Sequence, residues 1–265
     1  MTGEDIVRYA VRLPAGEAEL DGDLALPPGP RGIVVFAHGS GSSRYSPRNR
    51  QVAAAMQRAG YATLLMDLLT ADEEEIDQHT RELRFDIPVL ATRLSRAVDW
   101  LGGRPDTETL PIAIFGASTG AAAALVTAAD RPDRVRLVIS RGGRPDLAGE
   151  ALSRVAAPTL MIIGGADPQV LQLNREAAAR MGTHVDLRIV PDATHLFPEP
   201  GALEEIIDLS VLALDRYLGN GPDDQGEPES EADLIADLMR ADEDPLPDAQ
   251  VPGAGPDGSA PNTPA

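Results

Sequence analysis

The 265-residue sequence contains no cysteine and no lysine, and it has few aromatic side chains. The lack of cysteine excludes disulfide bonds, thiolate metal sites and a cysteine nucleophile. All 23 basic residues are arginine, which excludes chemistry that needs a lysine amine. Hydrophobic residues make up 43% of the chain and aromatic residues only 3%, so we expect a core of aliphatic side chains.

The chain also lacks a balance of charge: 42 acidic residues outnumber the 23 arginines, and the formal net charge is −19. A surface of this sign repels nucleic acids and anionic membranes, so neither is an expected partner. No apolar run is long enough to span a bilayer. The chain opens with acidic residues and has no apolar signal segment, which predicts a cytoplasmic protein.

The charge is distributed unevenly along the chain. Residues 219–265 hold twelve acidic residues and one arginine, a net charge of −11, together with eight prolines and six glycines. This composition is typical of a disordered tail that follows a folded domain of residues 1–218. Apolar residues in 230–241 have helical spacing. They favour a weakly helical piece of the tail over a helix that docks on the domain or on a protein partner.

Two hydrophobic patterns predict the fold. Alternation with a period of two in residues 7–13 and 18–26 predicts an antiparallel hairpin. The later part alternates short continuous apolar runs with helical segments, which is typical of parallel strands covered on both faces. The runs are 33–37, 62–66, 112–115, 135–139, 160–163 and 185–190. We therefore expect an α/β protein with a mostly parallel, doubly wound sheet and an N-terminal hairpin.

The run 112–115 leads directly into Gly116-Ala117-Ser118-Thr119-Gly120, and four alanines follow. A strand, a sharp turn that carries a serine, and a helix form the nucleophile elbow of serine hydrolases. The strained turn requires small neighbours, and Gly116 and Gly120 meet that need. The sequence therefore predicts Ser118 as a nucleophile.

A nucleophilic serine needs a histidine base and an acid that orients the histidine, in the chain order serine, acid, histidine on this fold. Asp167 follows the run 160–163, and His195 follows the run 185–190, so both belong at the carboxyl edge of the sheet with Ser118. Asp167 also precedes a proline and can cap a helix. Asp146, one strand earlier, is the rival for the acid.

The expected oxyanion hole combines the N–H of Thr119 with one from the loop at residues 38–43. Ser40 is the preferred second donor, with Gly41 as the alternative. The loop is rich in glycine and serine but lacks the spacing and the lysine of a P-loop. Nucleotide binding is therefore not expected.

The chain resembles the α/β-hydrolases, and more closely their dienelactone-hydrolase-like branch, over residues 5–218. Four motifs carry the resemblance: His38-Gly39-Ser40-Gly41, Gly116-Ala117-Ser118-Thr119-Gly120, Gly164-Gly165-Ala166-Asp167 and Ala193-Thr194-His195. The resemblance implies hydrolysis of esters or lactones. Dienelactone hydrolases use a cysteine at the elbow, whereas this chain has Ser118, which favours ordinary esterase chemistry. Some bacterial members of the branch are fused to phosphoribosyltransferase domains.

These observations predict a serine hydrolase that cleaves a small ester or lactone through an acyl-enzyme, with no metal or organic cofactor. A thioesterase or an amidase of the same fold is an alternative, because the triad does not choose the leaving group. A non-catalytic scaffold that recruits a partner through its tail is another.

Arginines near the predicted site suggest an anionic substrate. Arg44, Arg48 and Arg50 follow the loop at residues 38–43, and Arg141 and Arg144 follow the strand next to the elbow. Some of these arginines, with Arg44 and Arg141 as the candidate substrate-binding residues, could hold a carboxylate or phosphate. The competing interpretation is that these arginines pair with nearby acids and brace the loops.

Overall fold

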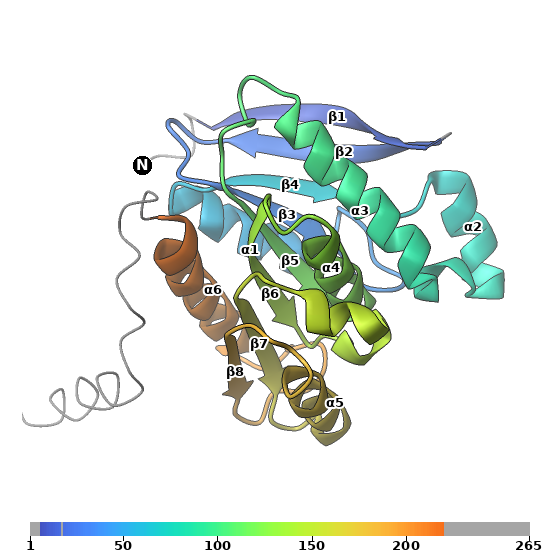
Figure 1. Ribbon diagram of the computed structural model, residues 1–265, viewed down its shortest axis with the longest axis vertical. Coiled ribbons are helices and arrows are strands. Elements are labelled where there is room, and N and C mark those ends of the chain that lie inside the picture. Colours follow the sequence, from blue (N-terminus) through green and yellow to red (C-terminus); the bar gives the residue numbers. More distant parts are fainter. Residues whose placement is uncertain (1–5, 17, 220–265) are drawn as a thin grey trace, which may run out of the picture. The chain divides into compact units, whose positions relative to one another are not determined.

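The computed structural model describes residues 6–16 and 18–219. Within these residues eight strands form one sheet in the order β1-β2-β4-β3-β5-β6-β7-β8 (Figure 1). The strands are β1 (Val7–Ala15), β2 (Ala18–Leu26), β3 (Ile33–Ala37), β4 (Ala62–Met66), β5 (Ile112–Ala117), β6 (Val135–Arg141), β7 (Thr159–Gly164) and β8 (Val185–Val190). The predicted acidic tail, apart from Gly219, lies outside the described residues, and so does the predicted helical piece at residues 230–241.

The sheet combines an antiparallel edge with a parallel body. β1 pairs with β2 and β2 with β4 in antiparallel register, and the remaining neighbours are parallel. The hairpin turns at Gly16, whose φ of +83° is readily adopted by glycine. The predicted hairpin and the mostly parallel sheet are both confirmed.

Helices cover both faces of the sheet. α3 and α4 pack on one face, with η3 and α5 beside them, and α1 and α6 pack on the opposite face (Figure 1). The helices are α1 (Pro47–Arg58), α2 (Ala71–Thr80), η2 (Leu83–Phe85), α3 (Ile87–Gly102), α4 (Thr119–Asp130), η3 (Pro145–Arg154), α5 (Pro168–Ala178) and α6 (Ala202–Leu218). Within the described range no helix has the length and apolar character needed to cross a membrane.

The central strands are buried on both faces, which explains their continuous apolar runs. Every residue of β3, β4 and β5 is buried. Successive residues pack into different core clusters: Val35 and Ile114 contribute to the α3/α4 side, and Val34 and Phe115 to the α1/α6 side. The alternation follows from side chains of a strand pointing to opposite faces.

The topology places the candidate site. β3 and β5 are neighbouring strands in the middle of the sheet. After β3 the chain enters α1 on one face of the sheet, and after β5 it enters α4 on the opposite face. In open α/β sheets, ligands bind beyond the carboxyl ends of strands at such a switch point. The loops after β3, β5, β6, β7 and β8 all leave the sheet at this edge, because these strands run parallel.

Two α-helices among the described residues have no counterpart among the predictions from sequence. α2 buries only Asp77, so it lacks the apolar stripe that reveals most helices. Its start is nevertheless marked by a capping box, because Thr70 accepts a hydrogen bond from Glu73 N–H while the Glu73 side chain accepts one from Thr70 N–H. α6 has an amphipathic pattern, burying Ile206, Ser210 and Leu214.

Candidate functional site

Ser118 occupies a sharp turn between β5 and α4. Its φ of 49° and ψ of −117° lie outside the ordinary helical and extended regions. A Cβ on Gly116 would lie 2.5 Å from Ala121 Cα, and one on Gly120 would overlap the carbonyl oxygen of Ala37. The two glycines therefore let α4 approach the ends of β3 and β5 closely. This backbone is the nucleophile-elbow geometry.

Asp167 and His195 come together at the ends of β7 and β8. His195 Nδ1–H donates a hydrogen bond of 2.8 Å to Asp167 Oδ2. A carboxylate only accepts, so in the neutral ring the proton lies on Nδ1 and Nε2 is left as a proton acceptor. Asp167 Oδ1 accepts from Val170 N–H at 3.4 Å and caps α5. Asp167 thus caps the helix and orients the histidine at once.

The backbone after β6 links the serine to the histidine. Ser118 N–H donates to the carbonyl of Arg141 at 3.3 Å. The next residue, Gly142, has a φ of 52°, and a Cβ there would lie 3.6 Å from His195 Cε1. Among the side-chain hydrogen bonds of the described residues there is none that joins Ser118 directly to His195. This contact is often long without substrate and tightens when substrate binds.

Asp146 lies elsewhere in the hydrogen-bond network. Both of its carboxylate oxygens accept from Arg144, from Nε at 2.8 Å and from Nη2 at 2.7 Å. This bidentate pair occupies the carboxylate. The acid that contacts His195 is Asp167.

The two candidate oxyanion donors face one small pocket. Ser40, Gly41 and Thr119 line it together with Leu69, and it holds about 230 Å³ of empty space, including open solvent. Thr119 is the first residue of α4, where backbone N–H groups lack an intrahelical acceptor. Gly39 packs against the serine, since a Cβ on it would lie 3.1 Å from Ser118 Cβ. The loop therefore reaches the serine with its backbone.

His38 holds the loop after β3 in place, a role that the sequence did not reveal. It is 6% exposed, its Nε2 accepts from Leu68 N–H at 3.0 Å, and its Nδ1 lies 2.9 Å from the carbonyl of Gly39. Burial lowers the pKa of His38, so the ring stays neutral. It ties the loop after β3 to the loop after β4.

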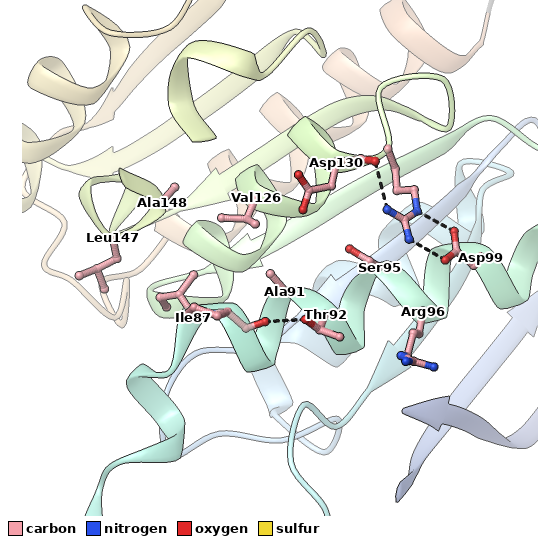
Figure 2. A pocket seen from close by; sticks show the side chains of 12 residues that line it. Ile87, Ala91, Thr92, Ser95, Arg96, Asp99, Val126, Asp130, Leu147 and Ala148 are labelled. Atoms are coloured by element: carbon pink, nitrogen blue, oxygen red, sulfur yellow. Dashed lines mark hydrogen bonds and ion pairs between the residues drawn. The ribbon is translucent and has the colours of Figure 1, made fainter. Parts of the chain in front are cut away.

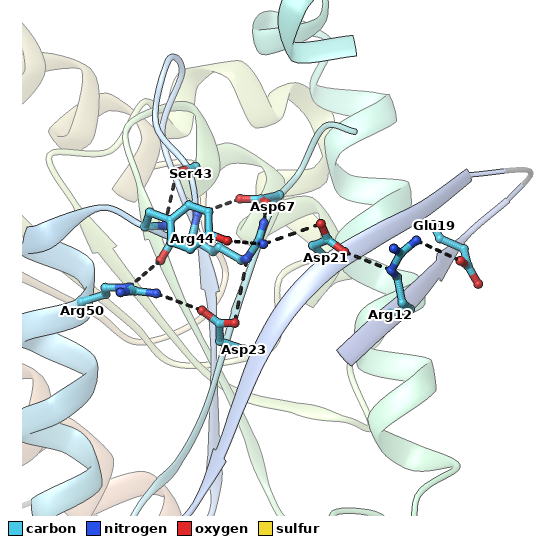
Figure 3. Close-up of polar contacts among 9 residues, drawn as sticks. Arg12, Glu19, Asp21, Asp23, Ser43, Arg44, Arg50 and Asp67 are labelled. Carbon is cyan, nitrogen blue, oxygen red and sulfur yellow. Dashed lines mark hydrogen bonds and ion pairs between the residues drawn. The ribbon is translucent and has the colours of Figure 1, made fainter. Parts of the chain in front are cut away.

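Arg44 is enclosed by carboxylates (Figure 3). Its guanidinium pairs with Asp67 and lies within 3.6 Å of Asp21 and 3.9 Å of Asp23, and its N–H donates to Asp67 at 2.8 Å. Burial opposes the charge on Arg44, but the neighbouring carboxylates, Asp67 above all, raise its pKa overall. Arg44, predicted to bind substrate, thus braces the loop after β3 against β2 and the loop after β4.

Arg141, the other predicted substrate-binding arginine, has the opposite surroundings. It is 9% exposed, and its Nε and Nη1 are buried without a hydrogen-bond partner in the described part of the chain. Burial, and to a smaller extent the positive charge of Arg48, lowers the pKa of Arg141 to about 10. Arg48 Nε is also buried and unpartnered.

A second hollow lies away from the predicted catalytic residues. It is a groove of about 1160 Å³ of empty space, including open solvent, along α3 and α4 (Figure 2). Ile87, Val126 and Leu147 give it an apolar end, and the ion pair of Arg131 with Asp99 closes the polar end. None of the predicted site residues lines it.

The sheet order, the antiparallel hairpin and the strained serine elbow together define an α/β-hydrolase fold. Residues 20–208 match the model of the dienelactone hydrolase family, which spans most of the chain. The chain belongs to the dienelactone hydrolase family.

Relatives of known structure agree with this assignment. A dienelactone hydrolase from Anabaena variabilis is 56% identical, with a TM-score of 0.79, over 81% of this chain and 100% of that one. Est1E from Butyrivibrio proteoclasticus shares the fold, with 15% identity and a TM-score of 0.67 over 80% of this chain and 99% of that one.

A longer relative carries a different name. A Mycobacterium tuberculosis protein named "Putative phosphoribosyl transferase" is 54% identical over 213 residues, which are 80% of this chain and 47% of that protein. The chain therefore spans less than half of that relative. The name describes the whole of the longer protein.

Proposed function

We propose that this protein is a serine hydrolase that cleaves a small carboxylic ester or lactone. The observation that carries the proposal is the 2.8 Å hydrogen bond from His195 to Asp167, at the same sheet edge as the Ser118 elbow. Family membership supports hydrolytic chemistry. The proposed catalytic residues are Ser118, His195 and Asp167.

The geometry suggests a two-step acyl transfer. His195 Nε2 removes the proton of Ser118 Oγ as the oxygen attacks the carbonyl carbon, and Asp167 stabilises the resulting imidazolium. The N–H groups of Thr119 and Ser40 stabilise the oxyanion. His195 then protonates the leaving group, and water activated by the same ring releases the acyl group and regenerates Ser118.

The pocket beside Ser40, Gly41 and Thr119 is nearly filled by its own lining, which includes the leucines Leu68, Leu69 and Leu90 and the charged residues Glu74 and Arg84. A compact acyl group suits so small a space better than a long one. Long acyl chains are therefore expected to react poorly.

The test compares the wild type with Ser118→Ala on 4-nitrophenyl esters of two to twelve carbons and on labelling by a fluorophosphonate probe. We expect labelling and turnover of the short esters in the wild type, and loss of both in the variant. Thioester and amide substrates in the same panel separate an esterase from a thioesterase or an amidase. A wild type that is neither labelled nor active would favour the non-catalytic scaffold.

A further inference from the structure

Asn174 is a buried amide inside α5, the helix that Asp167 caps. Its Nδ2 donates two hydrogen bonds, one of 2.8 Å to the carbonyl of Val170 in the same helix and one of 3.0 Å to the carbonyl of Gly143 in the loop after β6. Both partners only accept, so the amide nitrogen has to face them. Asparagine is a weak helix former and is costly to bury, so packing alone would favour an apolar residue here.

The Gly143 end of this bond belongs to the backbone that holds the serine. Arg144 N–H donates to the carbonyl of Ser118 at 3.1 Å. A Cβ on Gly143 would lie 2.8 Å from Cβ of Ala121 in the first turn of α4, so the loop packs against the elbow without room for a side chain. Residues 141–144 and the elbow therefore form one unit, which we call the serine unit.

The Asn174 end belongs to the backbone that holds the other two proposed catalytic residues. Asp167 accepts from His195 at 2.8 Å and from the N–H of Val170, which fixes the carboxylate to the start of α5. A backbone hydrogen bond of 2.9 Å joins the loops after β7 and β8. Residues 164–167, residues 193–195 and α5 therefore form a second unit, the acid–histidine unit.

The two units need more than one attachment to keep a fixed angle. At the sheet, Gly142 N–H donates to the carbonyl of Ile162 at 2.8 Å. Beyond the sheet, α5 packs on β7 and η3 (Figure 1). This helix of 11 residues fully buries only Val170, Asn174 and Ala177. Few apolar contacts resist a shift of α5, so the bond from Asn174 to Gly143 supplies the second attachment.

We propose that Asn174 is a positioning residue, which sets the distance and angle between Ser118 and His195 by tying α5 to the loop after β6. The amide does not touch the substrate and acts through the carbonyl of Gly143. This inference rests on the proposed function, because it concerns the alignment of the same three residues. A displacement of about 1 Å between reacting groups can lower a rate by about 100-fold.

The experiment compares Asn174→Leu with Thr127→Val. Leucine has nearly the shape of asparagine but no donor. Thr127 is a matched control, because it is also fully buried and donates to a backbone carbonyl, that of Ala91 in α3, at 3.2 Å. Both variants should lower the thermal midpoint, since each leaves a buried carbonyl without its donor. Well below both midpoints, only Asn174→Leu should lower kcat/KM for 4-nitrophenyl butyrate, by about 10- to 100-fold.

Binding and attack are then measured separately. Fluorophosphonate labelling uses the same serine and histidine, so its rate should fall by the same factor as kcat/KM in Asn174→Leu. The Kd for the same ester, measured by calorimetry in the Ser118→Ala background, should not change. A loss confined to attack at unchanged binding is expected of misalignment and not of a loosened fold.

A double-mutant cycle with His195→Ala identifies the route by which Asn174 acts. Without the imidazole there is nothing left to align, so Asn174→Leu should then lower the residual kcat/KM by less than about threefold. Thr127→Val should have an equally small effect in both backgrounds. If Asn174→Leu does not fold, Asn174→Ala, which removes the donor without adding bulk, goes through the same measurements.

Three results would overturn the proposal: unchanged kcat/KM in the Asn174 variant that folds, an equal loss in Thr127→Val, or the full loss repeated in the His195→Ala background. Failure of both Asn174 variants to fold would make the amide purely structural and would also overturn it. Failure of the proposed function is recognised differently. It appears as absent turnover and labelling in the wild type, or as turnover that survives in Ser118→Ala.

Discussion

Two regions beside the elbow differ in how their charged side chains are paired. In the bracing region, formed by Arg44, Asp67, Glu73, Asp77, Arg84 and Arg93, every charge has a close partner of opposite sign. In the reaction region, formed by Ser118, Arg141, Asp167 and His195, Ser118 is strained and Arg141 is buried without a partner. Satisfied networks rigidify a fold, whereas strained or unsatisfied groups are typical of functional sites. We therefore expect substitutions in the first region to affect stability and those in the second to affect activity.

The largest effect is expected from His195→Ala. In the proposed mechanism the imidazole moves protons in both steps, so its loss should lower kcat on a short ester by roughly four to six orders of magnitude. His79→Ala is the control, because His79 lies on the exposed face of α2. Steady-state kinetics measure kcat, and thermal unfolding checks that both variants fold. Comparable kinetics for the two variants would remove His195 from the mechanism.

Asp167→Asn should follow in magnitude. The neutral amide does not stabilise the imidazolium, and its NH2 group can donate to Nδ1 and select the wrong tautomer of His195, so kcat should fall by about 10⁴-fold. The thermal midpoint should change little, because asparagine also caps helices. Asp146→Asn is the matched control and should retain most activity. The reverse pattern would transfer the acid role to Asp146.

Arg44→Gln tests the bracing region. Its guanidinium is 14% exposed and Asp67 is 18% exposed, so the variant leaves a largely buried carboxylate without its cation. We expect the free energy of unfolding to fall by about 2 kcal/mol, measured in urea. Arg50→Gln, an exposed pair, should change it by no more than about 1 kcal/mol. A selective rise in KM for anionic esters at unchanged stability would instead assign Arg44 to the substrate.

The smallest effect concerns pH. Hydrogen bonds from Arg93 hold the pKa of Glu73 below its usual value of 4.5. A carboxyl group with a lowered folded-state pKa stabilises the protein above its unfolded-state pKa, and this stabilisation is lost as the pH falls through the folded-state value. Glu73→Gln should therefore reduce stability near neutral pH and flatten its decline below about pH 4.5. Parallel pH profiles for variant and wild type would contradict this.

The fold could be predicted because its signals are local. Continuous apolar runs marked β3 to β7, and the alternation in residues 7–26 marked the hairpin. α2 escaped prediction because it packs almost nothing apolar, so only its capping box identifies it. Periodicity reports burial, and an exposed helix has little of it.

The candidate site was only partly predictable. The order of Ser118, Asp167 and His195 is a property of the sequence, and loop position implied that they share an edge. The partners of the arginines depend on register. Arg44 reaches Asp21 and Asp23 because β2 pairs with β4 antiparallel, with Gly22 opposite Met66. No local pattern shows that Arg141 is buried while Arg44 is neutralised.

The most direct test of the central claim is to trap the acyl-enzyme. The wild type is mixed with excess 4-nitrophenyl acetate, quenched in acid within the first turnovers, and mapped by peptide mass spectrometry. The account predicts a burst of 4-nitrophenol and an acetyl group on Ser118, and neither in Ser118→Ala. An acetyl group on another residue at the burst stoichiometry, or a burst that persists in Ser118→Ala, would contradict it.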